Sequence, residues 1–111
     1  MEKERAVIAF VNGRFLHRGD AYRETASEEV VAVHKFDGPV AMVRRGYGLT
    51  LNLGNYESAR LDVSVEVPCH VEDVDAADEW ARAWVEERVK AEVSDVRESK
   101  GNGGGGRRGG I

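Results

Sequence analysis

Two short segments of this chain place arginine beside an aromatic ring, in a pattern that suits binding. The first, Arg-Phe-Leu-His-Arg, spans Arg14–Arg18, and the second, Arg-Arg-Gly-Tyr-Gly, spans Arg44–Gly48. Aromatic rings stack on unpaired bases at about 1–3 kcal/mol per base, and guanidinium groups attract phosphates. The two segments therefore predict a surface that holds single-stranded nucleic acid.

The residues expected to contact such a strand are Arg44, Arg45 and Tyr47 at the centre, with Arg14, Phe15, Arg18 and Tyr56 as flanking contacts. Tyr22-Arg23 adds a further ring and guanidinium near a chain reversal. The alternative interpretation is that Phe15 and Tyr47 are core residues and that the arginines are ordinary solvated strand ends.

The last twelve residues, Lys100–Ile111, include seven glycines and the adjacent pair Arg107-Arg108. Such a segment has almost no apolar surface to offset the entropy of ordering it, so residues 101–111 are expected to be a disordered tail. Arg107 and Arg108 would then form a mobile clamp on a phosphate backbone. The alternative is a solvated tail without function.

No pattern in the sequence indicates catalysis. His17, His34, His70 and the single thiol of Cys69 show none of the spacings that metal ligands or a nucleophile pair require, and there is no phosphate-binding loop. The carboxylates of residues 73–79 could bind Ca²⁺ weakly, but a helix start explains them better because its dipole favours negative charge. We expect no enzyme activity, no metal and no cofactor.

The net charge of −4 is unevenly distributed. Met1–Arg60 holds nine basic and eight acidic residues, whereas Glu72–Glu98 holds four basic and ten acidic ones. The acidity therefore belongs to one C-terminal segment and leaves room for a basic surface elsewhere. It also supports an alternative function, in which an acidic helix docks on a basic protein partner.

Apolar and polar residues alternate with a period of two over residues 48–53 and 59–67, which predicts a half-buried antiparallel sheet. Pro68 is expected to end the second of these strands. The other expected elements are a strand over Arg5–Val11, a hairpin turn at Asn12-Gly13, a return strand over Arg14–Arg18, a loop over Gly19–Ser27, and strands over Val30–Phe36 and Val40–Arg45.

Val71–Glu98 is predicted to be helical, because Ala, Trp and Val recur at three- and four-residue spacing, and Gly101 can close it. Trp80 and Trp84 are expected to seat this helix on the sheet. The fold class is therefore α+β: an antiparallel sheet of four to five strands with one long C-terminal helix on one face, in a single domain over residues 1–100.

The predicted helix is about twice as long as a five-residue strand. Its last turns, with Val89, Val93 and Val96, would need a partner, which predicts a homodimer or higher homo-oligomer through the helix. The alternative is a frayed end with incidental valines. No segment has the roughly 18 apolar residues of a membrane span, and Cys69 is alone, so we expect a soluble cytoplasmic protein. The absence of glutamine and the high valine content hint at a thermophilic source.

The stretch Leu51–Arg60, the alternating valines that follow, Val67-Pro-Cys69 and Trp84–Arg88 resemble small phage and thermophilic archaeal proteins of sheet-plus-helix type. Some small thermophile proteins of this type bind single-stranded DNA. The resemblance covers roughly residues 47–90 and implies a similar sheet and helix. With the arginine–aromatic segments, it predicts binding of single-stranded nucleic acid, with DNA favoured over RNA, without strong sequence preference. The alternative remains a viral or regulatory adaptor docking through its acidic helix or a sheet edge.

Overall fold

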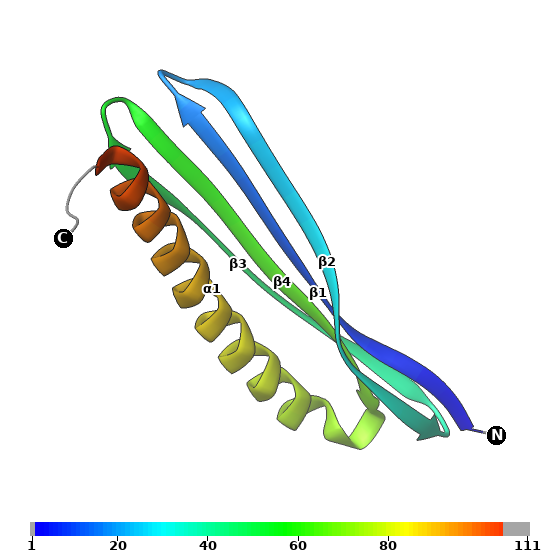
Figure 1. The fold of residues 1–111 in the computed structure, drawn as a ribbon. Helices are drawn as coiled ribbons and strands as arrows, with labels where there is room; N and C mark the ends of the chain where they lie inside the picture. The colour runs from blue at the N-terminus through cyan, green and yellow to red at the C-terminus, as the bar shows by residue number, and fades with distance from the viewer. Residues whose placement is uncertain (1, 106–111) are drawn as a thin grey trace.

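A computed structural model describes residues 2–105, and the side chains of residues 3–98. Within that range the chain forms four antiparallel strands and one long helix on one face of the sheet, which confirms the predicted α+β class (Figure 1). The elements are β1 Glu2–His17, β2 Asp20–Asp37, β3 Val40–Gly54, β4 Glu57–His70, a short 3-10 turn over Val71–Asp73, and α1 Val74–Gly105. None of the described helices has a stretch long and apolar enough to cross a membrane.

The sheet consists of two hairpins joined side by side, in the strand order β2-β1-β4-β3. The turns of both hairpins, β1–β2 and β3–β4, lie at the same end of the molecule, which we call the tip end (Figure 1). The β2–β3 connection at Gly38-Pro39 lies at the other end, the base end. Because α1 follows β4 at the base end, it runs back along the sheet towards the tip end.

The predicted hairpin turn at Asn12-Gly13 is wrong, because both residues lie within β1. The chain reverses instead at Arg18-Gly19, where φ is 54° and 86°. Gly13 serves close packing rather than a turn: a Cβ there would lie 2.9 Å from the Thr25 hydroxyl oxygen. A short-range turn signal was thus overridden by sheet packing.

The strands are much longer than predicted. The expected loop over Gly19–Ser27 is strand β2 from Asp20 onward, and its polar residues are tolerated because this edge strand is exposed. The expected strands over residues 40–45 and 48–53 form the single strand β3. Pro68 does not end β4, which continues to His70. The pairing of β4 with β1 ends at Glu66, so the proline, which has no N–H to donate, lies beyond that pairing.

The core lies between α1 and the helix-facing side of β1, β4 and β3. The predicted alternation in β4 is confirmed, since the helix-facing residues Ala59, Leu61, Val63, Val65 and Val67 are all buried. From α1, Ala81 and Val85 are buried and Trp84 packs at their side. The tryptophans stack on each other with ring centroids 6.4 Å apart, and Trp80 remains 43% exposed.

The predicted surplus of helix length does not exist. At about 1.5 Å per residue, the 32 residues of α1 span about 48 Å, and the 14 residues of β4 span about 46 Å at about 3.3 Å each. Val89 packs against the core of its own chain. The argument from length for a helix-mediated oligomer therefore fails. The helix also continues past Gly101, which was expected to close it, to Gly105.

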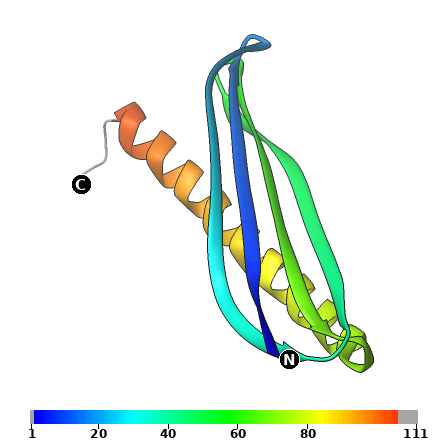
Figure 2. The same cartoon turned by 90° about the vertical axis from the view of Figure 1, so that its right-hand side faces the viewer.

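Two ion pairs hold α1 to the two edge strands. Arg45 of β3 donates two hydrogen bonds to Asp78, at 2.6 and 2.8 Å. Arg88 of α1 binds both carboxylate oxygens of Glu29 on β2, one of them at 3.0 Å, and Glu92 at 2.9 Å. These contacts lower the pKa of Asp78 and of Glu29 and raise the pKa of Arg88. Towards the tip end the helix swings away from the sheet (Figure 2).

Candidate functional site

The three residues expected at the centre of the site do not share one surface. Arg45 points towards α1, where it binds Asp78, and its neighbour Arg44 points to the opposite face, where it lies 3.6 Å from Glu66. Tyr47 lies two residues after Arg45 in β3, so its side chain faces the same side of the sheet as Arg45. The Tyr47 side chain is 56% exposed. The sequence alone placed these groups together only because they are neighbours in the chain.

Glycines 46 and 48 do not leave open space beside Tyr47. The site of a Cβ on Gly46 lies 3.4 Å from Ser64, and a Cβ on Gly48 would collide with the ion pair between Arg60 and Asp62. These two glycines therefore make room for neighbouring side chains of β4 and do not expose backbone to a ligand.

The sheet face opposite α1 is electrically mixed. Arg14 lies 3.6 Å from Glu24, and Arg60 lies 3.0 Å from Asp62. A hollow of about 410 Å³ on this face is lined by all four of these side chains. Its arginines already face carboxylates, so the hollow offers little net positive charge to a phosphate backbone.

A different group of predicted residues meets at the tip end. The Arg18 guanidinium lies over the Tyr56 ring, 4.6 Å from its centroid, and the Arg18 backbone N–H donates a 2.8 Å hydrogen bond to the Tyr56 carbonyl. Both residues have positive φ, 54° and 63°, as the two turns require. The Tyr56 ring is 74% exposed. The two hairpin turns are thus joined to each other and present a ring and a cation to solvent.

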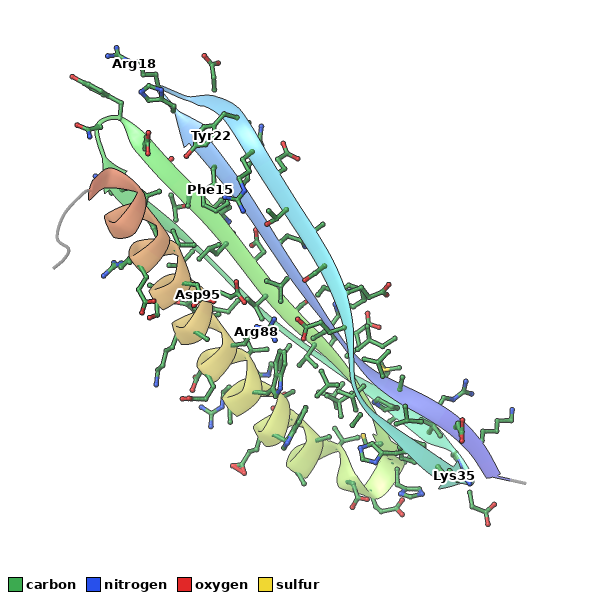
Figure 3. All side chains as sticks on the ribbon, viewed as in Figure 1. Phe15, Arg18, Tyr22, Lys35, Arg88 and Asp95 are labelled. Atoms are coloured by element: carbon green, nitrogen blue, oxygen red, sulfur yellow. The ribbon has the colours of Figure 1, made fainter. Side chains whose placement is uncertain are left out.

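A second ring and cation lie at the same end of the sheet, further along β1 and β2. The Arg23 guanidinium lies over the Phe15 ring at 5.1 Å, and the Tyr22 and Phe15 rings are 6.4 Å apart with a tilt of 49°. A shift of register between Phe15 and Leu16 leaves Tyr22 as an extra residue in β2, so two consecutive side chains of β2 reach one ring of β1. Figure 3 shows Phe15, Arg18 and Tyr22 at the same end of the sheet.

We call this group the tip cluster: Phe15, Arg18, Tyr22, Arg23 and Tyr56. Among the side chains that the structure describes, neither Arg18 nor Arg23 forms an ion pair with a carboxylate, unlike the four arginines described above. Resting on a ring leaves most of the five N–H donors of a guanidinium available. The tip cluster can therefore offer both rings and unneutralised cations to a ligand.

Tyr22 and Arg23 were not among the expected contacts, and the segment that holds them was predicted to be a loop. No clear alternation of apolar and polar residues marks this segment as a strand, and Arg23 lies opposite Phe15 because β2 pairs with β1 along its full length. Arg107 and Arg108, the expected clamp, lie outside the described residues.

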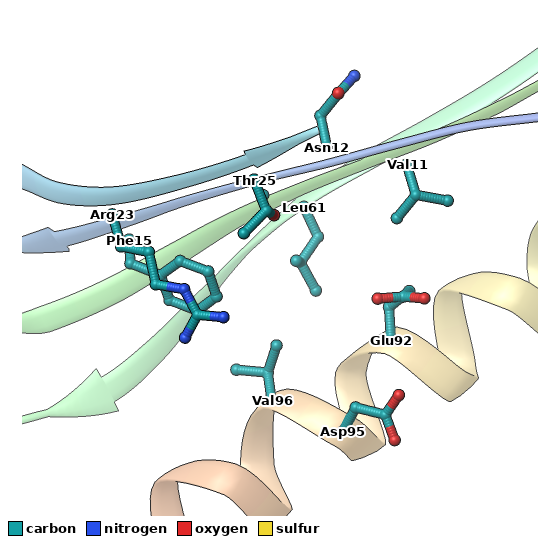
Figure 4. Close-up of a pocket in the computed structure, with 10 residues that line it drawn as sticks. Val11, Asn12, Phe15, Arg23, Thr25, Leu61, Glu92, Asp95 and Val96 are labelled. Atoms are coloured by element: carbon teal, nitrogen blue, oxygen red, sulfur yellow. The ribbon is translucent and has the colours of Figure 1, made fainter. Parts of the chain in front are cut away.

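Beside the tip cluster is a cleft of about 320 Å³, which we call the tip cleft (Figure 4). It exists because α1 departs from the sheet here. Phe15 and Arg23 form part of its wall, so the cleft opens next to the tip cluster. The remaining lining residues are Val11, Asn12, Gly13, Thr25 and Leu61 from the sheet and Glu92, Asp95 and Val96 from α1.

Cys69, His70 and Asp73 lie close together in the chain at the base end. Cys69 is buried, and burial, followed by the charge of Asp73, raises the pKa of its thiol, which makes the thiolate scarce. His70 Nδ1 lies 3.7 Å from an Asp73 oxygen. Across the described part of the chain, no three His, Cys, Asp or Glu side chains gather closely enough to hold a metal ion.

Comparison of the chain with models of protein families, with curated proteins and with solved structures finds no match. The site therefore has to be interpreted from its own geometry.

Proposed function

We propose that this protein binds single-stranded nucleic acid, with the tip cluster as its contact surface. The observation that carries the proposal is the gathering of three rings and two arginines from both hairpins at one end of the sheet, with neither arginine bound to a carboxylate among the described side chains. The predicted function is kept, and its centre moves from Arg44, Arg45 and Tyr47 to the tip end.

The chemistry of the tip cluster suits a strand whose bases are unpaired. Tyr22 and Tyr56 are 56% and 74% exposed, and each can stack on a base for about 1–3 kcal/mol whatever the base is. Arg18 and Arg23 lie against rings, so a phosphate bound by either one would be next to a stacked base. A paired duplex hides its base faces and gains little from such a surface.

The acidity of α1 restricts where the strand can lie. Net charge is −4, and most of the acidic surplus is on the helix, which repels phosphates. A strand held at the tip cluster meets at most two unneutralised arginines among the described side chains. These two arginines alone should make the logarithm of the binding constant fall with the logarithm of salt concentration with a slope of about −1.4, at about −0.7 per phosphate, and any phosphate bound by Arg107 or Arg108 should add to it.

The test is a fluorescence-anisotropy titration of a labelled 20-nucleotide oligo-dT with the full chain. The double variant Arg18→Gln/Arg23→Gln should bind at least tenfold more weakly. The matched control, Arg44→Gln/Arg60→Gln, loses the same charge from arginines that face carboxylates and should change affinity less than threefold. Equal losses in the two variants would assign binding to overall charge and remove the tip cluster from the proposal.

Arg107 and Arg108 are kept as additional contacts. A variant that ends at residue 105 should bind oligo-dT two- to tenfold more weakly than the full chain. Adding Arg18→Gln/Arg23→Gln to this shortened chain should weaken its binding further, as it does in the full chain. Unchanged affinity would show that the two terminal arginines do not take part.

The second candidate is an adaptor that adds a strand from a protein partner to the free edge of β3. That edge is 15 residues long and holds no Asp or Glu, whereas the other edge, β2, is interrupted by two shifts of register. Replacing Leu49 by proline would block such pairing and leave the tip cluster in place. Loss of partner binding in the Leu49 variant, together with unchanged partner binding in Arg18→Gln/Arg23→Gln, would favour the adaptor.

Association of copies also remains part of the proposal, although the length of α1 no longer supports it. Sedimentation velocity at several protein concentrations tests it. A monomer at all concentrations would end the proposal of a homo-oligomer without affecting the tip cluster.

A further inference from the structure

The tip cleft continues the surface of the tip cluster, because Phe15 and Arg23 belong to both. We propose that this cleft takes one unpaired guanine base of the bound strand. The inference rests on the proposed function and adds a preference to it: stacking on the tip cluster accepts any base, while the cleft selects one.

The size and walls of the cleft suit a flat heterocycle. Its volume of about 320 Å³ is at the small end of the range of about 300–1,000 Å³ for ligand sites. Val11, Leu61 and Val96 supply apolar walls, and the Phe15 ring closes the side next to the tip cluster (Figure 4). Gly13 forms part of the floor, where any side chain would take up space.

The charged groups of the cleft are arranged with acceptors on one wall and a donor on the other. Glu92 and Asp95 come from α1, and Arg23 comes from β2 (Figure 4). Glu92 already accepts a 2.9 Å hydrogen bond from Arg88, which leaves Asp95 as the carboxylate without an ion pair among the described side chains. An ionised carboxylate can only accept hydrogen bonds, and its two oxygens can accept a pair of parallel ones.

Guanine is the base that satisfies both walls. Its Watson–Crick edge carries two adjacent donors, N1–H and N2–H₂, which match the two oxygens of Asp95. Its O6 and N7 are adjacent acceptors, which match the donors of an arginine such as Arg23. Adenine and cytosine each place an acceptor beside their single amino group, and thymine flanks its one N–H with two carbonyls. For these bases the carboxylate would face an oxygen or nitrogen lone pair, which is repulsive.

Two 15-nucleotide strands separate the cleft from the tip cluster: oligo-dT, and the same strand with three isolated dG residues, spaced so that they cannot form four-stranded structures. The full-length protein should bind the dG-containing strand about tenfold more tightly. Asp95→Asn should reduce this preference to less than twofold, because the amide replaces one acceptor by a donor. Binding of oligo-dT by Asp95→Asn should be unchanged or slightly tighter.

Two controls isolate the proposed contact. Glu98→Gln removes a negative charge one turn further along α1 from a residue that does not line the cleft, and it should keep the tenfold preference. Replacing dG by deoxyinosine removes only the N2 amino group. The preference should fall several-fold in the unmodified protein and should not change in Asp95→Asn.

The outcomes separate the two proposals. Equal affinity for both strands, or a preference that survives Asp95→Asn, overturns the guanine site and leaves binding at the tip cluster intact. Failure of both strands to bind overturns the proposed function, and the guanine site with it. A preference for any purine, shown by equal affinity for strands carrying dA and dG, also overturns the guanine assignment.

Discussion

The part of this molecule nearer the base end, which we call the base half, and the tip end are made of the same four strands and one helix, but the arginines that hold α1 and those of the tip cluster make different contacts. In the base half, Arg45 and Arg88 bind carboxylates that hold α1 to the sheet. At the tip end, Arg18 and Arg23 lie on aromatic rings and bind no carboxylate among the described side chains. The first use stabilises the fold, and the second leaves cations available to a ligand.

The base half and the tip end also differ in how deeply their apolar side chains are buried. The base half contains the sealed contact of Ala81 and Val85 with the valines of β4, and the Phe36 ring is buried edge-on against His70 at 5.1 Å. The tip end exposes Tyr22 and Tyr56 and contains the tip cleft. Because exposed rings contribute little to folding, their energy remains available for binding. We therefore expect substitutions in the base half to change stability and substitutions at the tip end to change binding.

The largest expected effect is on stability and comes from Trp84→Ala in the base half. Loss of this ring from the helix–sheet contact should lower the free energy of unfolding by about 3 kcal/mol, measured by urea denaturation. Trp80→Ala is the matched control and should cost about 1 kcal/mol or less, because Trp80 is 43% exposed. Affinity of the folded protein for oligo-dT should be unchanged in both variants. Equal costs would show that Trp84 does not anchor the helix.

The next effect is on binding and comes from Tyr56→Ala at the tip end. Affinity for oligo-dT should fall about 5- to 150-fold, which corresponds to the loss of about 1–3 kcal/mol of stacking, and the free energy of unfolding should change by less than about 0.5 kcal/mol. Tyr47→Ala removes a ring that is 56% exposed in mid-strand and should leave affinity nearly unchanged. If Tyr47→Ala weakens binding as much as Tyr56→Ala, the contact surface extends along β3 and the two ends do not differ.

The smallest effect is a loss of stability in acid, which involves the ion pairs of the base half. Hydrogen bonds from Arg88 and Arg45 lower the pKa of Glu29 and of Asp78 in the folded chain. In the unfolded chain these groups titrate near about 4.3 and 3.9, so the unfolded state takes up protons first as pH falls. Their contribution is therefore complete above about pH 5 and is lost as pH falls through the lower pKa values of the folded state.

Urea denaturation at pH 7, 5 and 3 measures this loss. Glu29→Gln and Asp78→Asn should each flatten the decline between pH 5 and pH 3, whereas Glu98→Gln, which forms no ion pair with another described side chain, should not. A decline of the same steepness in all three variants would mean that other carboxylates control acid stability.

Local patterns determined the fold class. The alternating residues of β4 and the three- and four-residue spacing of α1 are periodicities that burial of one face imposes on any sequence, so they can be read without knowing the partner element. Strand lengths were missed for the same reason. The polar start of β2 and the pair Asn12-Gly13 look locally like a loop and a turn, and only pairing with distant strands makes them extended.

The sequence by itself determined that this chain has a valine-rich antiparallel sheet, a long amphipathic helix and several arginines beside rings. Only the tertiary structure decided which arginines are neutralised: Asp78 reaches Arg45, and Phe15 and Tyr56 meet Arg23 and Arg18. The physical reason is that an ion pair or a ring contact acts over a few ångströms. Which groups come that close depends on strand register and on where the helix leaves the sheet.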